Sequence, residues 1–303
     1  MDERDGLAER FETQRGRLRA VAHRMLGSLD EADDAVQEAW LRLGRIDAGE
    51  VDNLGGWLRT VVTRICLDML RSRSSRREDL TAQETLDHVA NPARANLRED
   101  PEDEALLTDS VSRALLVVLD ALGPAERVAF VLHDMYAVPF DEIAPIVERT
   151  PVATKKLASR ARHKVRGRPV VPASELARNR QVVSAFLAAA RAGDLGAILA
   201  VLDPDVVRRA DPAALPPGGA TVVRGARAVA EGTAALAQRS RLAEIALVDG
   251  AVGVVVAPRG RLLFALTFTV ENDRVAAYEV IADPVRLRRL RLAVLDRPPT
   301  ELS

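Results

Sequence analysis

The chain has 303 residues, of which 48% are hydrophobic and 29% are charged, and its formal net charge is −1. This length allows two or three compact domains. The near-zero charge excludes a globally basic nucleic-acid binder, so any such surface must come from local clusters.

Cys66 is the only cysteine, which excludes an intrachain disulfide framework and argues against a cysteine-based zinc site. We therefore expect no metal and no other cofactor. A basic start followed by an apolar run is missing, as is any stretch of about 18 apolar residues, so neither a signal peptide nor a membrane span is expected. These features favour a reducing, cytoplasmic location.

The first segment, residues 7–77, is predicted to be helical. Ser28 and Glu31 have capping-box spacing, and apolar residues then recur at helical spacing from Ala32 to Leu43. Residues 30–38 hold five acids and no base. Charge at a helix N-terminus explains Asp30 and Glu31 but not Glu38 two turns later, so a docking face for a basic partner is the second interpretation.

Gly55-Gly56 interrupts the chain before a second amphipathic stripe that begins at Trp57. Between residues 59 and 77 arginine recurs six times, and Asp68 is the only acid. This pattern suits a helix that contacts nucleic acid, and it equally suits a solvated face that ends in an Arg/Ser tail. Residues 78–104 are polar, contain Asn91-Pro92 and are predicted to be a linker.

Residues 105–168 are predicted to be helical again, with a helix-turn-helix at 140–166. A short apolar helix (140–147) is followed by Thr150 as N-cap and Pro151 at the first helical position. The second helix runs from Val152 to Val165. Its predicted inner face consists of Val152, Leu157, Ala161 and Val165.

The charged side chains of the second helix are all basic. Residues 149–168 contain eight Lys or Arg and no acid, which suits phosphate contacts and guanine edges and is unlike a solvated face in a bundle that does not bind DNA. Because a recognition helix reads bases mainly near its N-terminus, Lys155, Lys156 and Ser159 are the base-edge candidates. The other predicted DNA contacts, mainly to phosphate, are Arg149, Thr150, Arg160, Arg162 and Lys164.

Two residues of the helix-turn-helix do not fit the pattern. Pro145 removes a backbone hydrogen bond inside the first short helix and is expected to kink it. Glu148 occupies the turn, where a glycine would relax the backbone, and it places a carboxylate close to the expected DNA surface.

Residues 174–295 change in character. Two helices (174–192 and 194–202) precede alternating apolar runs separated by turn signals such as Asp249-Gly250, which predicts an antiparallel meander of four strands. A last helix is expected over 284–295, with Arg286, Arg288, Arg289 and Arg291 on a basic face that packs on the helical part of the chain. This face would meet the acidic residues 99–104.

The motifs DEADDAVQEAWLRL (30–43) and GWLRTVVTRICLDMLR (56–71), followed by the helix-turn-helix, resemble extracytoplasmic-function sigma factors of the sigma-70 family. The resemblance covers residues 7–77 as sigma domain 2 and 105–168 as sigma domain 4. It implies a face that docks on core RNA polymerase, formed by Asp30, Asp33, Asp34, Gln37, Glu38 and Trp40. It also implies that the loop 45–56 and helix 57–77 bind the −10 promoter element through Asn53, Trp57, Arg59, Arg64, Arg71 and Arg73, while the helix-turn-helix reads the −35 element.

The C-terminal part resembles the appended domain of the sigma-J-like subgroup, which is a SnoaL-like, nuclear transport factor 2-like domain. The matching stretches are AAARAGDL (188–195), LDPDV (202–206), VRGA (223–226) and ADPVRL (282–287). The implied fold is multidomain: two all-α sigma domains, then an α+β cone with a curved antiparallel sheet at 174–295.

The predicted function is a sigma factor, not an enzyme, that binds core RNA polymerase and promoter DNA, and whose C-terminal domain modulates activity in cis. The cone could hold a small ligand, and a separate anti-sigma factor is neither required nor excluded. One alternative is a helix-turn-helix regulator that acts without polymerase docking. Another is a SnoaL-like enzyme fused to a DNA-binding module. The C-terminal domain has no histidine, and Asp205 and Asp211 resemble turn residues, which disfavours acid–base chemistry there.

Overall fold

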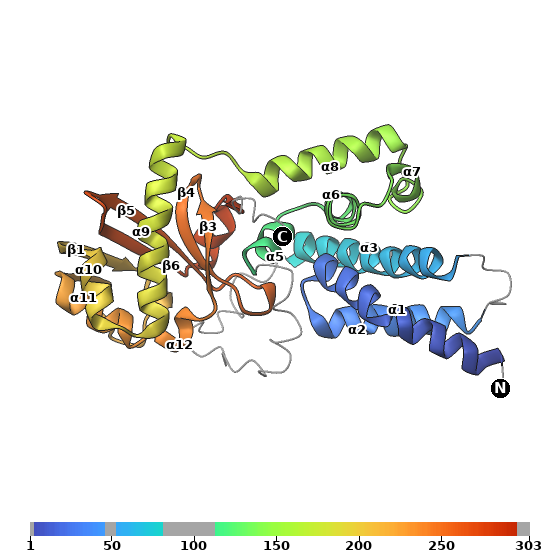
Figure 1. Ribbon diagram of the computed structural model, residues 1–303, viewed down its shortest axis with the longest axis horizontal. Helices are drawn as coiled ribbons and strands as arrows, with labels where there is room; N and C mark the ends of the chain where they lie inside the picture. Colours follow the sequence, from blue (N-terminus) through green and yellow to red (C-terminus); the bar gives the residue numbers. More distant parts are fainter. Residues whose placement is uncertain (1–2, 46–52, 81–112, 296–303) are drawn as a thin grey trace, which may run out of the picture. The chain divides into compact units, whose positions relative to one another are not determined.

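The computed structural model describes residues 3–45, 53–80 and 113–295, and the chain divides into two compact units (Figure 1). Unit 1 comprises residues 1–88 and 119–163, and unit 2 comprises residues 89–118 and 164–303. The predicted loop 45–56 lies partly, and the linker 78–104 mostly, outside the described residues.

Unit 1 begins with three helices, α1 (Glu3–Leu26), α2 (Leu29–Leu43) and α3 (Leu54–Leu80). The predicted cap at Ser28 is confirmed, since its side chain accepts a hydrogen bond from the Glu31 N–H at 3.4 Å. Ala32, Ala35 and Val36 of the predicted apolar stripe are buried, so α2 turns its acidic side away from the core. The three helices pack on one another.

The other helices of unit 1 among the described residues are α6 (Pro124–Phe130), a π-helical turn η3 (Val131–Met135), α7 (Phe140–Ile143) and α8 (Pro151–Arg166), whose end from Lys164 onward falls in unit 2. The helix α5 (Arg113–Asp120) is divided between the two units. Its start is capped inside unit 2, where the Glu244 carboxylate accepts hydrogen bonds from the N–H groups of Arg113 and Ala114, both at 3.0 Å.

The helix-turn-helix corrects two sequence-based details. The first helix, predicted over 140–147, spans only Phe140–Ile143, so Pro145 lies beyond its end and does not kink it. Val152 was predicted to face inward, but its side chain is 68% exposed. The inner stripe of α8 contains Thr154, Ala158, Ala161 and Val165, which are all buried. Leu157 is half-buried at the edge of this stripe.

Unit 2 is an α+β domain, as predicted. The helices α9 (Ala173–Ala192), α10 (Leu195–Val201), α11 (Ala226–Ala234) and α12 (Ala237–Ser240) accompany a seven-stranded sheet of order β2-β1-β6-β5-β4-β3-β7. The strands are β1 (Leu202–Ala210), β2 (Val222–Arg224), β3 (Ala243–Val248), β4 (Ala251–Val256), β5 (Phe264–Glu271), β6 (Arg274–Ile281) and β7 (Leu292–Ala293). The pairing register shifts within the β1–β6 and β5–β6 pairs. Irregularities of this kind bend strands.

The four-stranded meander predicted from the turn signals is confirmed as β3 to β6. The flanking strands were missed, and the β1–β6 pair is parallel rather than antiparallel. The strands β2 and β7 are too short to show alternation, and β1 carries Pro204 and two arginines that obscure its pattern.

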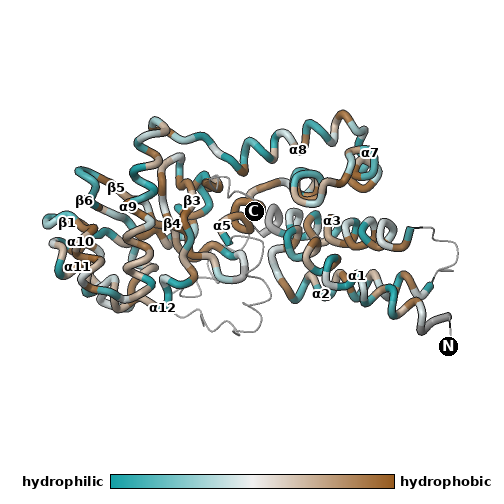
Figure 2. The backbone as a smooth tube through the Cα atoms, in the orientation of Figure 1, coloured by the Kyte–Doolittle hydropathy of each residue, from teal (hydrophilic) through white to brown (hydrophobic). Residues whose placement is uncertain are grey.

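The core of unit 2 is apolar. Phe186 of α9 packs with Phe268 of β5 and Tyr278 of β6, with ring centroids 5.4–5.7 Å apart. The Tyr278 hydroxyl is buried and lies 3.0 Å from the Thr233 hydroxyl, so its polar end has a partner. The residues of α8, in contrast, are mostly hydrophilic (Figure 2).

The predicted last helix (284–295) is wrong in length, because α13 spans only Pro284–Arg289. Asp283 caps this helix by accepting a hydrogen bond from the Arg286 N–H at 2.8 Å. Leu290 is extended, and β7 then pairs with β3. Strand pairing and burial of Ala293 therefore override the helical pattern of the sequence. The acidic residues 99–104 lie outside the described residues.

Candidate polymerase and nucleic-acid interfaces

The acidic side of α2 is solvent-accessible. Asp30, Asp33, Asp34 and Gln37 are exposed, while Glu38 and Trp40 are half-buried. Asp33 pairs with Arg19 of α1 at 2.7 Å, and Glu38 pairs with Arg42 one turn later at 2.9 Å. Within the described residues, Asp30 and Asp34 have no ion-pair partner. Their carboxylates are therefore the most available to a basic partner.

Trp40 packs against α1. Its ring lies 4.8 Å from that of Phe11 of α1, centroid to centroid. The aromatic pair fixes α2 against α1 and thereby sets the direction of the acidic face.

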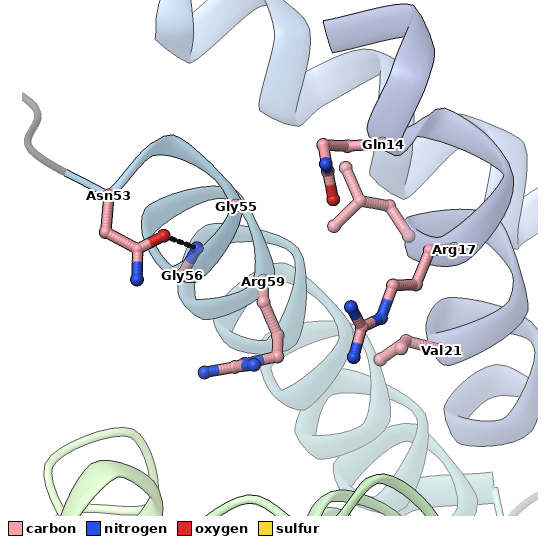
Figure 3. A pocket seen from close by; sticks show the side chains of 8 residues that line it. Gln14, Arg17, Val21, Asn53, Gly55, Gly56 and Arg59 are labelled. Carbon is pink, nitrogen blue, oxygen red and sulfur yellow. Dashed lines mark hydrogen bonds between the residues drawn. The ribbon is translucent and has the colours of Figure 1, made fainter. Parts of the chain in front are cut away.

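A pocket of about 360 Å³ lies between α1 and the start of α3 (Figure 3). Its lining residues are Gln14, Arg17, Leu18, Val21, Asn53, Gly55, Gly56 and Arg59. Leu18 and Val21 line it but are almost fully buried, while Gln14, Arg17 and Asn53 add hydrogen-bonding groups. These groups can address the polar atoms at the edge of a flat ring.

Asn53 and the glycine pair shape this pocket. The Asn53 side-chain oxygen accepts a hydrogen bond from the Gly56 N–H at 2.9 Å, which caps α3. A Cβ on Gly56 would lie 2.9 Å from the Asn53 amide nitrogen, so any larger residue would displace that side chain. The glycine therefore lets the cap lie close against the helix.

Sequence reasoning identified Asn53 and Arg59 but missed Gln14 and Arg17. These two residues share a face of α1 with Leu18 and Val21, at spacings of three, four and seven residues. The spacing was a usable signal. Only the fold, however, brings this face against the start of α3.

Two predicted −10 arginines are paired with carboxylates of the helix-turn-helix inside unit 1. Arg59 lies 2.6 Å from Glu142 of α7, and Arg71 lies 3.6 Å from Glu148 in the turn before α8. Glu148 adopts a left-handed backbone (φ 56°), so it is strained where glycine would be relaxed. Arg64 is exposed.

Arg73 has a structural partner. It pairs with Glu31 of α2 and donates a hydrogen bond to the Leu26 carbonyl at 3.0 Å. It thus ties α3 to the turn between α1 and α2. Trp57 is half-buried and lies next to the pocket residue Gly56.

The first two turns of α8 present exposed cations. Arg149, Lys155 and Lys156 are exposed, and Ser159 is half-buried on the same side. Thr150 is confirmed as the cap, because its hydroxyl oxygen accepts a hydrogen bond from the Ala153 N–H at 3.2 Å.

Farther along α8, two arginines have partners within unit 1. Arg160 lies 3.4 Å from Glu126, and Arg162 lies 2.8 Å from Asp134. Lys164 is exposed and falls in unit 2. The charge most available to DNA is therefore at the N-terminal end of the helix.

Arg127 of α6 is an unexpected core residue, only 2% exposed, and it lies 3.2 Å from Asp120. Burial, together with the positive charges of Arg24, Arg19 and Arg127, lowers the pKa of His23 to about 4. Burial also raises the pKa of the Cys66 thiol to about 12, although Arg127 opposes this shift. Cys66 is therefore an inert core thiol at neutral pH.

In unit 2, Asp211 is more than a turn residue. Its carboxylate accepts hydrogen bonds from the N–H groups of Ala282 and Asp283, both at 3.0 Å, and pairs with Arg286. Partial burial raises the pKa of Asp211, but the Asp283 and Ala282 N–H groups and the Arg286 guanidinium lower it more, so its pKa lies below the ordinary value. A carboxylate held in this way is a structural anchor.

Among residues 3–45, 53–80 and 113–295, no cluster of three or more His, Cys, Asp or Glu side chains is arranged to hold a metal ion. Over the same part of the chain, no helix is long and apolar enough to cross a membrane.

Comparison with known proteins relates these surfaces to a family. Residues 11–76 match the model for sigma-70 region 2. The chain is 34% identical over 297 residues to the probable ECF RNA polymerase sigma factor SigI of Mycobacterium tuberculosis H37Rv, covering 96% of this chain and 98% of that protein. It is 36% identical over 287 residues to ECF RNA polymerase sigma factor SigJ of the same strain, covering 90% and 91%.

The crystal structure of Mycobacterium tuberculosis SigJ matches 93% of this chain and 98% of that chain, at 32% identity and a TM-score of 0.45. Because the sequence matches to SigI and SigJ run through both units, the resemblance to the sigma-J-like subgroup is confirmed. The chain belongs to the extracytoplasmic-function sigma factors, which bind core RNA polymerase and direct promoter recognition and transcription initiation.

Proposed function

We propose that the chain performs this function through three surfaces: the acidic side of α2 for polymerase, the α1–α3 pocket for the −10 element, and the N-terminal end of α8 for the −35 element. The one-signed cationic end of α8 carries the proposal, because Arg149, Lys155 and Lys156 are exposed on a helix-turn-helix whose first helical turn holds no acid. The domains proposed are 7–77, 105–168 and 174–295.

The pocket suits capture of an unpaired base from the melted −10 element. A base has polar edges that Gln14, Arg17 and Asn53 can address, and Leu18 and Val21 lie beneath the pocket. Arg17 and Arg59 can hold the neighbouring phosphates. For Arg59 this requires release of its pair with Glu142.

On α2, Asp30 and Asp34 lead the polymerase contact, with Asp33, Gln37 and Glu38 beside them and Trp40 as the packing support. Because Asp30 and Asp34 have no ion-pair partner in the part of the chain that the structure describes, contact with basic groups would break no ion pair seen there. The chain would act where RNA polymerase and the chromosome are, which agrees with its single, reduced cysteine.

The C-terminal domain is proposed to regulate the sigma function in cis and to catalyse no reaction. Its aromatic cluster of Phe186, Phe268 and Tyr278 fills the core, and Asp211 is held by three donors instead of being free to take up a proton. A small ligand in the cone could adjust this regulation, which does not require a separate anti-sigma factor.

The test is reconstitution with core polymerase and DNA selected from a genomic library. Replacing Asp30 and Asp34 with Ala is expected to lower polymerase binding while leaving binding to duplex DNA intact. Glu231→Ala is the control, since this exposed acid in α11 pairs with Arg227 one turn away and lies outside the three proposed surfaces. Unchanged polymerase binding by the double variant would favour a regulator that acts without docking.

A further inference from the structure

The exposed Val152 stands out on the cationic face of α8. Its side chain is 68% exposed, whereas the inner stripe of the helix is buried. Lys155, Lys156 and Ser159 follow it by three, four and seven residues, so they share its side of the helix. An apolar side chain thus lies in the middle of the surface that is proposed to enter the major groove.

The first turn of α8 holds Val152 in a fixed position. Thr150 caps the helix, and the buried Thr154 hydroxyl donates a hydrogen bond to the Thr150 carbonyl at 3.0 Å. Pro151 limits the backbone further. A β-branched side chain has one strongly preferred rotamer in a helix, so both Val152 methyl groups are presented without loss of side-chain freedom on binding.

Only one feature of a base edge in the major groove is apolar, the C5-methyl group of thymine. Valine has no donor or acceptor with which to read any other edge. The surrounding cations, Arg149, Lys155 and Lys156, supply the charge complementarity that brings this turn against DNA.

We propose that Val152 is a specificity-determining residue that reads a thymine methyl group in the −35 element. This inference rests on the proposed role of α8 in duplex binding. The methyl contact would add sequence preference to a surface whose charged groups give mainly affinity.

The experiment uses the full chain with core polymerase and a −35 duplex obtained from the selected DNA. Each thymine is replaced in turn by deoxyuridine, which removes only the methyl group. The wild-type protein is expected to lose about fourfold in affinity at one thymine, as for one buried methyl group. Val152→Ala, whose shorter side chain withdraws both γ-methyl groups, should show a smaller loss at that position.

Val170→Ala is the matched control, since Val170 is 66% exposed but lies outside α8. It should discriminate thymine from uracil as the wild type does. Alanine is also a better helix former than valine, so Val152→Ala is expected to keep α8 intact.

The outcomes separate the two proposals. If wild-type protein binds the −35 duplex no better than a scrambled duplex, the role of α8 in promoter recognition fails. If it binds specifically but Val152→Ala keeps full discrimination at every thymine, only the role of Val152 is overturned. A specifically bound element without thymine would overturn it equally.

Discussion

Replacing Asp211 with Asn is expected to destabilise the C-terminal domain. The side chain is only 12% exposed, and its two oxygens serve two backbone N–H groups and Arg286. An amide keeps the shape but has one acceptor oxygen, so either the backbone donors or the guanidinium must face an NH₂ group. Loss of a hydrogen bond to a charged group costs about 1.5–3 kcal/mol.

For a domain of this size, that loss lowers the unfolding midpoint of the affected transition by about 3–12 °C. Differential scanning calorimetry of the full chain at pH 7 measures it. Asp205→Asn is the control, because Asp205 is exposed on β1 and its carboxylate has no hydrogen-bond partner among the described residues.

The pH dependence gives a second readout. The folded-state pKa of Asp211 lies below its unfolded value, so its contribution is present above about pH 4 and is lost as pH falls through the folded pKa. The gap between wild type and Asp211→Asn should therefore narrow in acid. Equal midpoints at pH 7, or a gap that stays constant in acid, would refute the anchoring role.

Three further outcomes are expected. Combining Glu142→Gln with Glu148→Gln should raise the affinity of the free protein for single-stranded −10 DNA about two- to thirtyfold, because exposed ion pairs of this kind contribute about 0.2–1 kcal/mol each. Unchanged binding in filter assays would contradict the idea that these carboxylates compete with DNA for Arg59 and Arg71. Gly167→Ala should lower the thermal midpoint, because its φ is 61° and the new Cβ would lie 2.4 Å from that of Ala293, while Gly232→Ala in α11 has room and should not. Because the pKa of folded His23 is about 4, unit 1 should lose stability as pH falls from about 6.5 towards 4, and His23→Gln should remove that part of the acid sensitivity seen by circular dichroism.

The helical stretches could be predicted from sequence because their signals are local. Ser28 and Thr150 cap helices where the pattern placed them, and the meander follows its turn residues. The orientation of Val152 could not be predicted in this way. A valine at a helix start fits the periodicity of an inner face, but the buried stripe begins at Thr154, whose hydroxyl is satisfied by the Thr150 carbonyl.

For the candidate site, too, the sequence pattern alone could not predict which side chains are available for binding. Charge patterning singled out the acidic and basic helices, but whether a charge is available depends on tertiary partners. Asp33 and Arg73 are paired with residues from other helices, while Asp30 and Asp34 have no partner within the described residues. The pocket needs Arg17 of α1 beside Asn53, and no sequence spacing links those two helices.

The helix α8 offers a physical route for regulation in cis. Its cationic first turns belong to unit 1, whereas its last residues belong to unit 2. There the Val165 carbonyl accepts a hydrogen bond from the Val294 N–H at 2.8 Å, just after β7, and the Val170 N–H donates to the Gly250 carbonyl at 3.0 Å. Within unit 2, the last residues of α8 are therefore held to the segment that follows β7. Regulation by this route needs neither an active site in the C-terminal domain nor a direct contact of that domain with DNA.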